Sequence, residues 1–123
     1  MTDEVRLTIP AEEDFRGVVH LVLGGLAVRL DLTFEVLEDL QLAVESLLER
    51  RDDERDVTIA VVLEPGELRT SIGPFEDGIA GDLARDENGF GLRRVLTTVC
   101  DRFELVERDG ERWVELSKQV EGH

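Results

Sequence analysis

Residues 88–92 of this 123-residue chain read Asn88-Gly89-Phe90-Gly91-Leu92, and they introduce a run of apolar residues at helical spacing. From Leu92 onward the apolar positions recur at intervals of three and four residues, which predicts an amphipathic helix. Gly89 and Gly91 leave the backbone amides unobstructed at the start of that helix, where the helix dipole favours an anion such as phosphate. The same G-x-G pattern is also typical of a sharp turn from a loop into a helix.

Five further segments alternate apolar and polar residues, which is the pattern of half-buried strands. The first, residues 4–9, ends at Pro10, which cannot donate a hydrogen bond to a neighbouring strand. The other four flank two turn sequences, Pro65-Gly66 and Asp109-Gly110. They therefore predict two β-hairpins, formed by residues 57–63 with 68–72 and by residues 103–106 with 113–116.

Two long amphipathic helices are predicted between the first strand and the first hairpin. Apolar residues follow i, i+3, i+4, i+7 spacing in residues 15–30 and again in residues 33–51. The segment between them, Asp31-Leu32-Thr33, offers a helix cap. The first helix contains three glycines, each of which weakens it by about 1 kcal/mol relative to alanine, so they either mark a close approach of another element or are merely tolerated. These glycines are Gly17, Gly24 and Gly25.

The predicted order of elements is β-α-α-β-β-loop-α-β-β. Residues 73–88 contain Gly73, Pro74, Gly78 and Gly81 with little periodicity, and they predict a long loop. Five strands and about three helices fit an α+β fold, a two-layer sandwich whose helices pack on one face of a mixed, mostly antiparallel five-stranded sheet. Since no linker, repeat or low-complexity tract divides residues 1–123, a single domain is expected.

The composition narrows the classes of function. Twenty-nine acidic residues against 14 basic ones give a net charge of −15. This charge repels nucleic acid and anionic membrane surfaces, so neither is expected as a partner. The charge either keeps the protein soluble or attracts a basic protein partner. No apolar run approaches the roughly 20 residues of a membrane span, and the first residues lack the features of a signal peptide. A cytoplasmic location is therefore expected.

Few residues are suited to metal binding or nucleophilic catalysis. The single cysteine, Cys100, lies in an apolar helical stretch and is interpreted as a buried small hydrophobic residue. It has no neighbouring His or Lys in sequence that would activate a thiol. His20 is expected to lie away from any other candidate ligand, and His123 is terminal. No metal site is predicted.

Together these segments resemble the anti-sigma-factor serine kinases (RsbW/SpoIIAB-like), small histidine-kinase-like members of the GHKL ATPase superfamily in bacterial partner-switching systems. The resemblance covers nearly the whole chain. It depends on residues 7–11, the helix junction at 30–33, residues 38–45, and Gly89-Phe90-Gly91-Leu92 before a helix and a final hairpin. It implies the histidine-kinase-like ATPase (Bergerat) fold, a homodimer, and partner docking near the nucleotide lid.

In the family that the chain resembles, the second helix carries a glutamate that acts as general base and, four residues later, an asparagine that holds Mg²⁺. These positions fall on Ser46 and Arg50 here. Serine is no base at neutral pH, and arginine has no lone pair to offer a metal, so no metal ligand is predicted at Arg50. A shift of one residue would place Glu45 at the base position and Glu49 at the metal position. Glu45 therefore stays an alternative catalytic candidate.

The family also has an aspartate that binds the adenine amino group, just after the strand equivalent to residues 68–72. That position falls on or near Pro74. The segment Asp77-Gly78-Ile79-Ala80-Gly81 has the composition of the family's first glycine box without its D-x-G-x-G spacing. Asp77 is therefore either a shifted substitute or part of a flexible acidic loop.

Only the closing glycine box keeps the family's pattern. By the resemblance, Gly89, Gly91 and Leu92 are candidates for the phosphate or lid side of a nucleotide site. Arg93 and Arg94, just inside the following helix, either add positive charge toward an anion or lie solvated at the surface.

Three functions agree with these residues. The favoured one is a regulatory domain that binds a sigma factor or an antagonist protein, with no cofactor and without efficient ATP hydrolysis or kinase activity. The first alternative is a Mg-ATP-dependent protein serine/threonine kinase with Glu45 as base. The second is a nucleotide-binding sensor without turnover, in which ATP or ADP orders residues 73–88.

Overall fold

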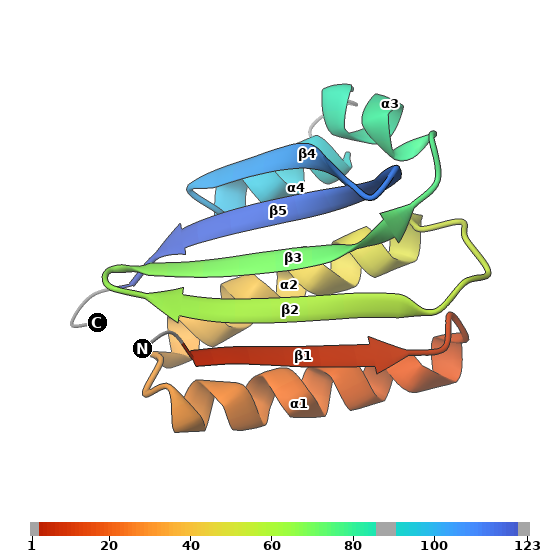
Figure 1. The fold of residues 1–123 in the computed structure, drawn as a ribbon. Helices are drawn as coiled ribbons and strands as arrows, with labels where there is room; N and C mark the ends of the chain where they lie inside the picture. Colours follow the sequence, from red (N-terminus) through yellow and green to blue (C-terminus); the bar gives the residue numbers. More distant parts are fainter. Residues whose placement is uncertain (1–2, 86–90, 121–123) are drawn as a thin grey trace.

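The computed structural model describes residues 3–85 and 91–120. A five-stranded sheet forms one layer, and helices α1, α2 and α4 lie on one of its faces, with the short α3 near the end of β3 (Figure 1). This confirms the predicted two-layer α+β fold. The elements are β1 (Asp3–Ile9), a 3-10 helix η1 (Glu13–Phe15), α1 (Arg16–Arg29), α2 (Phe34–Arg50), β2 (Val57–Glu64), β3 (Glu67–Phe75), α3 (Ile79–Ala84), α4 (Leu92–Val99), β4 (Arg102–Arg108) and β5 (Glu111–Gln119).

The strand order is β1-β2-β3-β5-β4, and each neighbouring pair of these strands is antiparallel. The expectation of a mostly antiparallel sheet is confirmed, and the described strands form no parallel pair that would make it mixed. Both predicted hairpins, β2–β3 and β4–β5, are present. Between β1 and β2 the chain passes through two helices that run in opposite directions, so it re-enters the sheet antiparallel to β1 (Figure 1).

One face of the sheet and the inner sides of the helices form the core. Val61 lies opposite Val5 and Thr70, and Thr70 lies opposite Leu116, so these positions form one row across four strands. Val61, Thr70 and Leu116 are at most 3% exposed. The alternation along each strand therefore separates the core side from the open side of the sheet. The helices contribute Val19, Leu23, Leu26, Leu40, Val44, Leu47, Leu92 and Leu96 to the core.

The outer side of α1 is apolar as well, which the prediction of a single apolar stripe did not anticipate. Leu21 and Val28 are 76% and 83% exposed, and Val18 is 40% exposed. Periodicity identified most of the buried stripe, but Val18, which the pattern also placed on that stripe, is exposed, and Leu21 and Val28 between its members are apolar. Despite this composition, no helix in residues 3–85 or 91–120 is long and apolar enough to cross a membrane.

The glycines of α1 do not mark a close contact within the chain. A Cβ atom added at Gly17, Gly24 or Gly25 would meet no other atom within 4 Å. The interpretation that they permit close packing against another element of the same chain is therefore wrong.

The prediction of a long loop over residues 73–88 is wrong for residues 73–84, and residues 86–88 lie outside the described residues. β3 continues through Gly73 and Pro74 to Phe75, and α3 follows at Ile79. Phe75 and Ile79 are 2% and 0% exposed, so burial of large apolar side chains overrides the turn-favouring composition of the segment. Four α-helices are therefore present in the described residues, where about three were expected.

Local signals at the ends of elements are confirmed. Thr33 Oγ1 accepts a hydrogen bond of 3.1 Å from the Val36 amide and caps α2. Asp109 and Gly110 have φ angles of 52° and 79°, as the two-residue turn of the β4–β5 hairpin requires. These short-range signals hold because the groups involved are neighbours in the sequence.

Candidate functional site

One side of α2 faces α4 and the outer strands. Asp39 Oδ2 lies 2.8 Å from Lys118 Nζ on β5, and the same ammonium group donates a 3.0 Å hydrogen bond to the carbonyl oxygen of Val99 at the end of α4. Residues at i, i+4, i+7 and i+11 share one helix face, so Ser46 and Arg50 lie on the same side as Asp39. Ser46 is half-buried there and Arg50 is exposed.

Glu45 lies on a different side of α2, toward α1. Its Oε1 is 2.8 Å from Nδ1 of His20, and Gln41, one turn earlier, donates a 3.3 Å hydrogen bond to the His20 carbonyl oxygen. The expectation that His20 lies away from other candidate ligands is therefore wrong, because α1 and α2 run antiparallel and bring the two positions together. With 54% and 44% of the two side chains exposed, the pair contributes little stability.

On the α4-facing side of α2, the Asp39 carboxylate is paired with Lys118, and the two candidate positions carry a hydroxyl and a guanidinium group. Serine is no base at neutral pH, and a guanidinium group has no acceptor atom for Mg²⁺, so Ser46 and Arg50 do not supply the base and the metal ligand of a magnesium–nucleotide site. The part of the chain that the structure describes contains no group of three or more His, Cys, Asp or Glu side chains placed to hold a metal ion.

Arg51 ties the end of α2 to the end of β3, although the sequence analysis gave it no role. Its side chain is 3% exposed. Nε donates to the carbonyl oxygen of Pro74 at 2.8 Å, and Nη1 to that of Asp53 at 3.0 Å. Nη2 donates to the carbonyl oxygens of Arg55 and Asp56 at 2.9 and 3.2 Å. Burial lowers the pKa of this guanidinium group, and the Asp53 carboxylate partly opposes that shift.

The loop that Arg51 organises also carries a strong ion pair. Asp53 Oδ2 lies 2.5 Å from Nη2 of Arg55, and Nη1 of Arg55 lies 2.7 Å from Oε1 of Glu111 on β5. The hydrogen bond from the Arg55 side chain is the main reason that the pKa of Asp53 falls to about 2. The loop between α2 and β2 is therefore held to the sheet at both ends.

The expected adenine side of the site lies beside this loop. Pro74 has no carboxylate, and its carbonyl oxygen accepts the hydrogen bond from Arg51. The amide of Asp52 donates to Glu76 Oε2 at 3.2 Å. Asp77, the candidate substitute for the adenine-binding aspartate, is exposed and forms an ion pair with Arg112 on β5. Carboxylates are present near the end of β3, but they contact protein groups.

The start of α4 partly matches the glycine box. Gly91 is the N-cap residue, with φ −75° and ψ 166°, and Leu92 is 2% exposed. Arg93 Nη1 donates a 3.3 Å hydrogen bond to the carbonyl oxygen of Leu83 on α3. Gly89 lies outside the described residues. The described half of the box is therefore a helix start anchored by a buried leucine, and Arg93 is engaged with α3.

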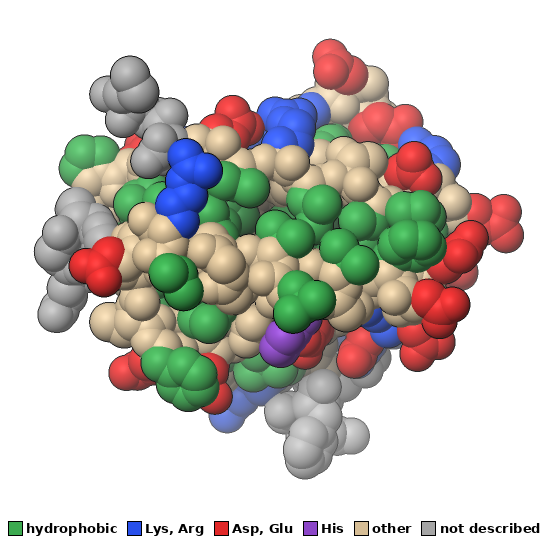
Figure 2. Space-filling view, turned by 90° about the horizontal axis from the view of Figure 1, so that it is seen from below, with side chains coloured by type: hydrophobic (Ala, Val, Ile, Leu, Met, Phe, Trp, Pro, Cys, Tyr) green, Lys and Arg blue, Asp and Glu red, His purple; other side chains and the backbone are tan. Residues whose placement is uncertain are grey.

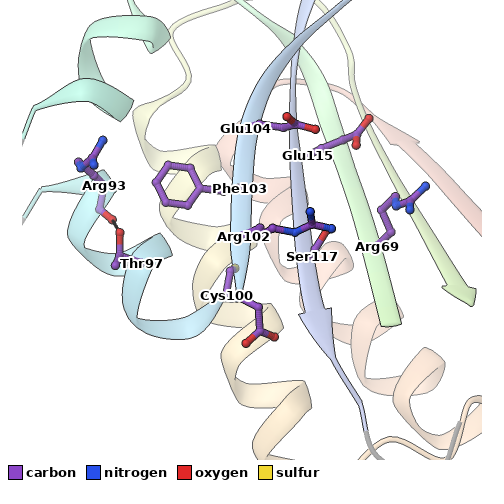
Figure 3. Close-up of a pocket in the computed structure, with 10 residues that line it drawn as sticks. Arg69, Arg93, Thr97, Cys100, Arg102, Phe103, Glu104, Glu115 and Ser117 are labelled. Carbon is purple, nitrogen blue, oxygen red and sulfur yellow. Dashed lines mark hydrogen bonds between the residues drawn. The ribbon is translucent and has the colours of Figure 1, made fainter. Parts of the chain in front are cut away.

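A cavity of about 600 Å³ lies at the outer edge of the sheet, around β4 (Figure 3). Phe103 points toward α4, whereas Arg102 and Ser117 lie on the other side of β4 (Figure 3). Cys100 also lines the cavity, and its burial raises the pKa of the thiol to about 11, so the thiol is protonated at neutral pH. None of the candidate positions on α2 lines this cavity.

Comparison with known proteins finds similar sequences and a similar fold. No family model matches the chain. "Serine-protein kinase RsbW" of Halalkalibacterium halodurans is 29% identical over 129 residues, covering 88% of this chain and 78% of the relative. The protein of the same name from Oceanobacillus iheyensis is 30% identical over 98 residues, covering 76% and 56%. The solved RsbU and RsbW domains of Rv1364c from Mycobacterium tuberculosis superpose with a TM-score of 0.70 at 13% identity, covering 96% of this chain and 32% of that chain.

These matches support an RsbW-like GHKL family for this chain. The RsbW-like chain spans about half of the Oceanobacillus relative and about a third of the solved chain. An activity of those longer proteins is therefore not assigned to this chain unless its own residues can perform it.

Two features of this RsbW-like fold escaped the sequence analysis, namely the role of Arg51 and the contact between His20 and Glu45. Residues 50–56 are all charged, and nothing in that run distinguishes the arginine that is buried from the one that is exposed. Only the approach of the end of β3 selects Arg51. The contact between His20 and Glu45 could have been expected from the antiparallel packing of two helices that follow each other in the sequence.

Proposed function

We propose that this chain is a regulatory domain that binds a sigma factor or an antagonist protein, without efficient ATP hydrolysis or kinase activity. The proposal is carried by the α4-facing side of α2, where half-buried Ser46 and exposed Arg50 lie at the positions that the resemblance assigns to the family's base and metal ligand. Phosphoryl transfer depends on positioning and on neutralisation by a metal, so the loss of both groups lowers its rate by many orders of magnitude.

The surroundings of that helix face support the same proposal. Glu45, the base of the kinase alternative, directs its carboxylate to His20 on α1. Pro74 offers no carboxylate to an adenine amino group, and the buried guanidinium of Arg51 occupies its carbonyl oxygen. The alternative base and the position expected to bind adenine are therefore both engaged with protein groups.

The partner class follows from family membership and charge. A net charge of −15 suits a basic, DNA-binding protein, because complementary potentials speed association and select the partner. The proposal includes a homodimer, as the family resemblance implies. It also includes a cytoplasmic location, because that is where a sigma factor acts.

Calorimetric titration with ATP and with ADP, with and without Mg²⁺, tests the proposal. A ligand that binds the native state raises the melting temperature. Because we expect no nucleotide binding, we expect neither heat nor a shift in melting temperature for the natural chain at millimolar nucleotide. The double variant Ser46→Glu with Arg50→Asn is expected to gain nucleotide binding. Arg102→Asn, which removes a positive charge from β4, is the control and is expected to behave like the natural chain.

Two results would contradict the proposal. Micromolar binding of Mg-ATP with transfer of labelled phosphate to a serine of a candidate antagonist would favour the kinase. Micromolar binding without transfer would favour the nucleotide sensor. Capture of a sigma factor by the natural chain in the absence of nucleotide is the positive result expected.

A further inference from the structure

β4 is an open edge of the sheet. It pairs with β5 on one side, and within residues 3–85 and 91–120 no strand lies on its other side (Figure 1). An edge strand leaves a row of N–H and C=O groups unpaired, and many proteins blunt such an edge with a proline, a bulge or a very short strand. β4 has seven residues, contains no proline and keeps an unbroken register with β5. A further strand can therefore pair with this β4 edge, residues 102–108.

The charged side chains of β4 lack the partners that those of its neighbours have. Every charged side chain on β3 and β5 belongs to an ion pair within the chain. On β4 this is true of Arg108, which pairs with Glu115. Arg102, Glu104 and Glu107 are exposed and form no ion pair with any described residue. Charges without partners are therefore concentrated along the β4 edge.

The opposite edge of the sheet is arranged differently. Glu4 and Arg6 of β1 lie two residues apart, and Glu4 Oε1 is 3.1 Å from Arg6 Nη2. Arg102 and Glu104 have the same spacing and opposite charges, but their side chains do not pair. Glu104 instead lies directly opposite Glu115, with both carboxylates on the open side of the sheet (Figure 3). Like charges at such positions repel, so a cation from a further strand would be stabilised beside Glu104.

The cavity of about 600 Å³ provides room on both sides of a strand added there. On the helix side, Phe103 points toward α4, and Thr97 and Cys100 also line the cavity (Figure 3). Arg102 and Glu104 line it on the open side of the sheet. Successive side chains of a strand point to opposite faces of a sheet. An added strand would therefore place one side chain against Phe103 and its two neighbours beside Arg102 and Glu104.

We propose that the β4 edge binds an extended peptide segment of a partner protein, which pairs antiparallel with β4. Every neighbouring pair of strands in this sheet is antiparallel, and this pairing is the more stable one per residue. From its N-terminus, the segment carries a basic residue opposite Glu104, an apolar residue opposite Phe103 and an acidic residue opposite Arg102. Its main chain supplies affinity, and its alternating side chains supply selectivity.

The charges make the β4 edge selective. Charged side chains on an edge hinder pairing with arbitrary strands, and they favour a strand whose charges are complementary. The β4 edge lies at the far side of the sheet from β1 and α1, whose hydrophobic surface Figure 2 shows. A peptide bound at β4 therefore leaves that surface uncovered, and the site is independent of the proposed function.

Titration of the isotope-labelled chain with the capped synthetic peptide Thr-Val-Lys-Val-Asp, followed by NMR, tests the site. The lysine of this peptide is placed opposite Glu104 and its aspartate opposite Arg102. The control peptide, Thr-Val-Asp-Val-Lys, has the same composition with the two charges exchanged. We expect the first peptide to shift the amide signals of β4 and to bind at least about tenfold more tightly, because opposite charges directly across strands stabilise pairing and like charges weaken it. Equal affinities, or no binding of either peptide, would overturn the proposal.

Exchanging the charges on the protein provides the second test. Arg102→Glu with Glu104→Arg is expected to reverse the preference, so that Thr-Val-Asp-Val-Lys binds more tightly. Glu4→Arg with Arg6→Glu makes the same exchange on β1 and is the matched control, expected to keep the natural preference. All four positions are exposed, so both variants should keep the natural far-ultraviolet spectrum. A β4 variant that keeps the natural preference, or a β1 variant that reverses it, would overturn the proposal.

Methylation of the peptide amides distinguishes strand pairing from attraction between charges alone. Alternate amides of a paired strand point toward its neighbour. Methylating one alternate set is therefore expected to abolish binding and methylating the other set to preserve it, whereas equal effects would overturn strand pairing. Cys100, the single cysteine, lines the helix side of the cavity, so bound peptide is expected to slow its alkylation. Unchanged alkylation at saturating peptide would place the peptide elsewhere and overturn the site.

Discussion

Replacing Arg51 with methionine measures what the buried guanidinium contributes to the fold. The side chain is 3% exposed and donates to four backbone carbonyl oxygens at 2.8–3.2 Å. The bonds to Pro74 and Asp53 are partly buried, whereas those to Arg55 and Asp56 are exposed, so the latter two carbonyl groups can turn to water. Hydrogen bonds to a charged group contribute roughly 1.5–3 kcal/mol each, so the two partly buried bonds set an expected loss of about 3–6 kcal/mol.

Urea unfolding monitored by circular dichroism provides the assay. Arg51→Met is expected to lower the midpoint with little change in slope, and to lower the melting temperature by about 10–20 °C. Arg50→Met removes the same charge at the neighbouring, exposed position and is expected to change the free energy of unfolding by no more than about 0.5 kcal/mol. Arg51→Lys keeps the charge but loses the planar fork, so its stability should fall between the two. Equal effects of Arg51→Met and Arg50→Met would refute the reasoning.

Two further predictions concern the sheet and the α2–β2 loop. Gly73→Ala is expected to destabilise the fold by about 1–3 kcal/mol in thermal unfolding, because the added Cβ would lie 2.5 Å from Trp113 Cδ2. The control is Gly78→Ala, whose added Cβ would meet no atom within 4 Å. Equal losses of stability in the two variants would contradict this explanation. The pKa of Asp53 is lowered from 3.8 to about 2 in the folded chain, so its carboxylate stabilises the fold above about pH 4, and this contribution is lost as the pH falls through 2. The difference in unfolding free energy between the natural chain and Asp53→Asn should therefore be full at neutral pH and shrink between about pH 4 and 2, whereas a constant difference would contradict the assigned pKa.

Sequence patterns predicted much of the fold because their signals are local. The hairpin at Asp109-Gly110 and the cap at Thr33 depend on groups a few residues apart, and both are present. The prediction failed over residues 73–84, where Phe75 and Ile79 are buried in a core that also contains residues distant in the chain. Composition alone gave that segment the character of a loop.

Some features of the candidate site could likewise be predicted from the sequence, whereas others depend on the tertiary structure. The identities of Ser46, Arg50 and Pro74 are properties of the sequence, and the prediction of a nucleotide site without its base and metal ligand depends on these identities and on the resemblance. The direction of Glu45 toward His20 depends on how α1 and α2 pair, which the residues of α2 do not encode by themselves.

The sequence by itself predicted the five strands, the two hairpin turns, the long helices α1 and α2, and the resemblance to the RsbW-like kinases. Only the tertiary structure decided that Arg51 is buried while Arg50 is exposed, that Glu45 contacts α1, and that Leu21 and Val28 lie uncovered on the outer side of their helix. The physical reason is that turns, caps and periodicity arise from interactions between neighbours along the chain. Burial depends on which distant elements pack against each other. Of two neighbouring side chains of the same type, one can therefore be buried and the other exposed.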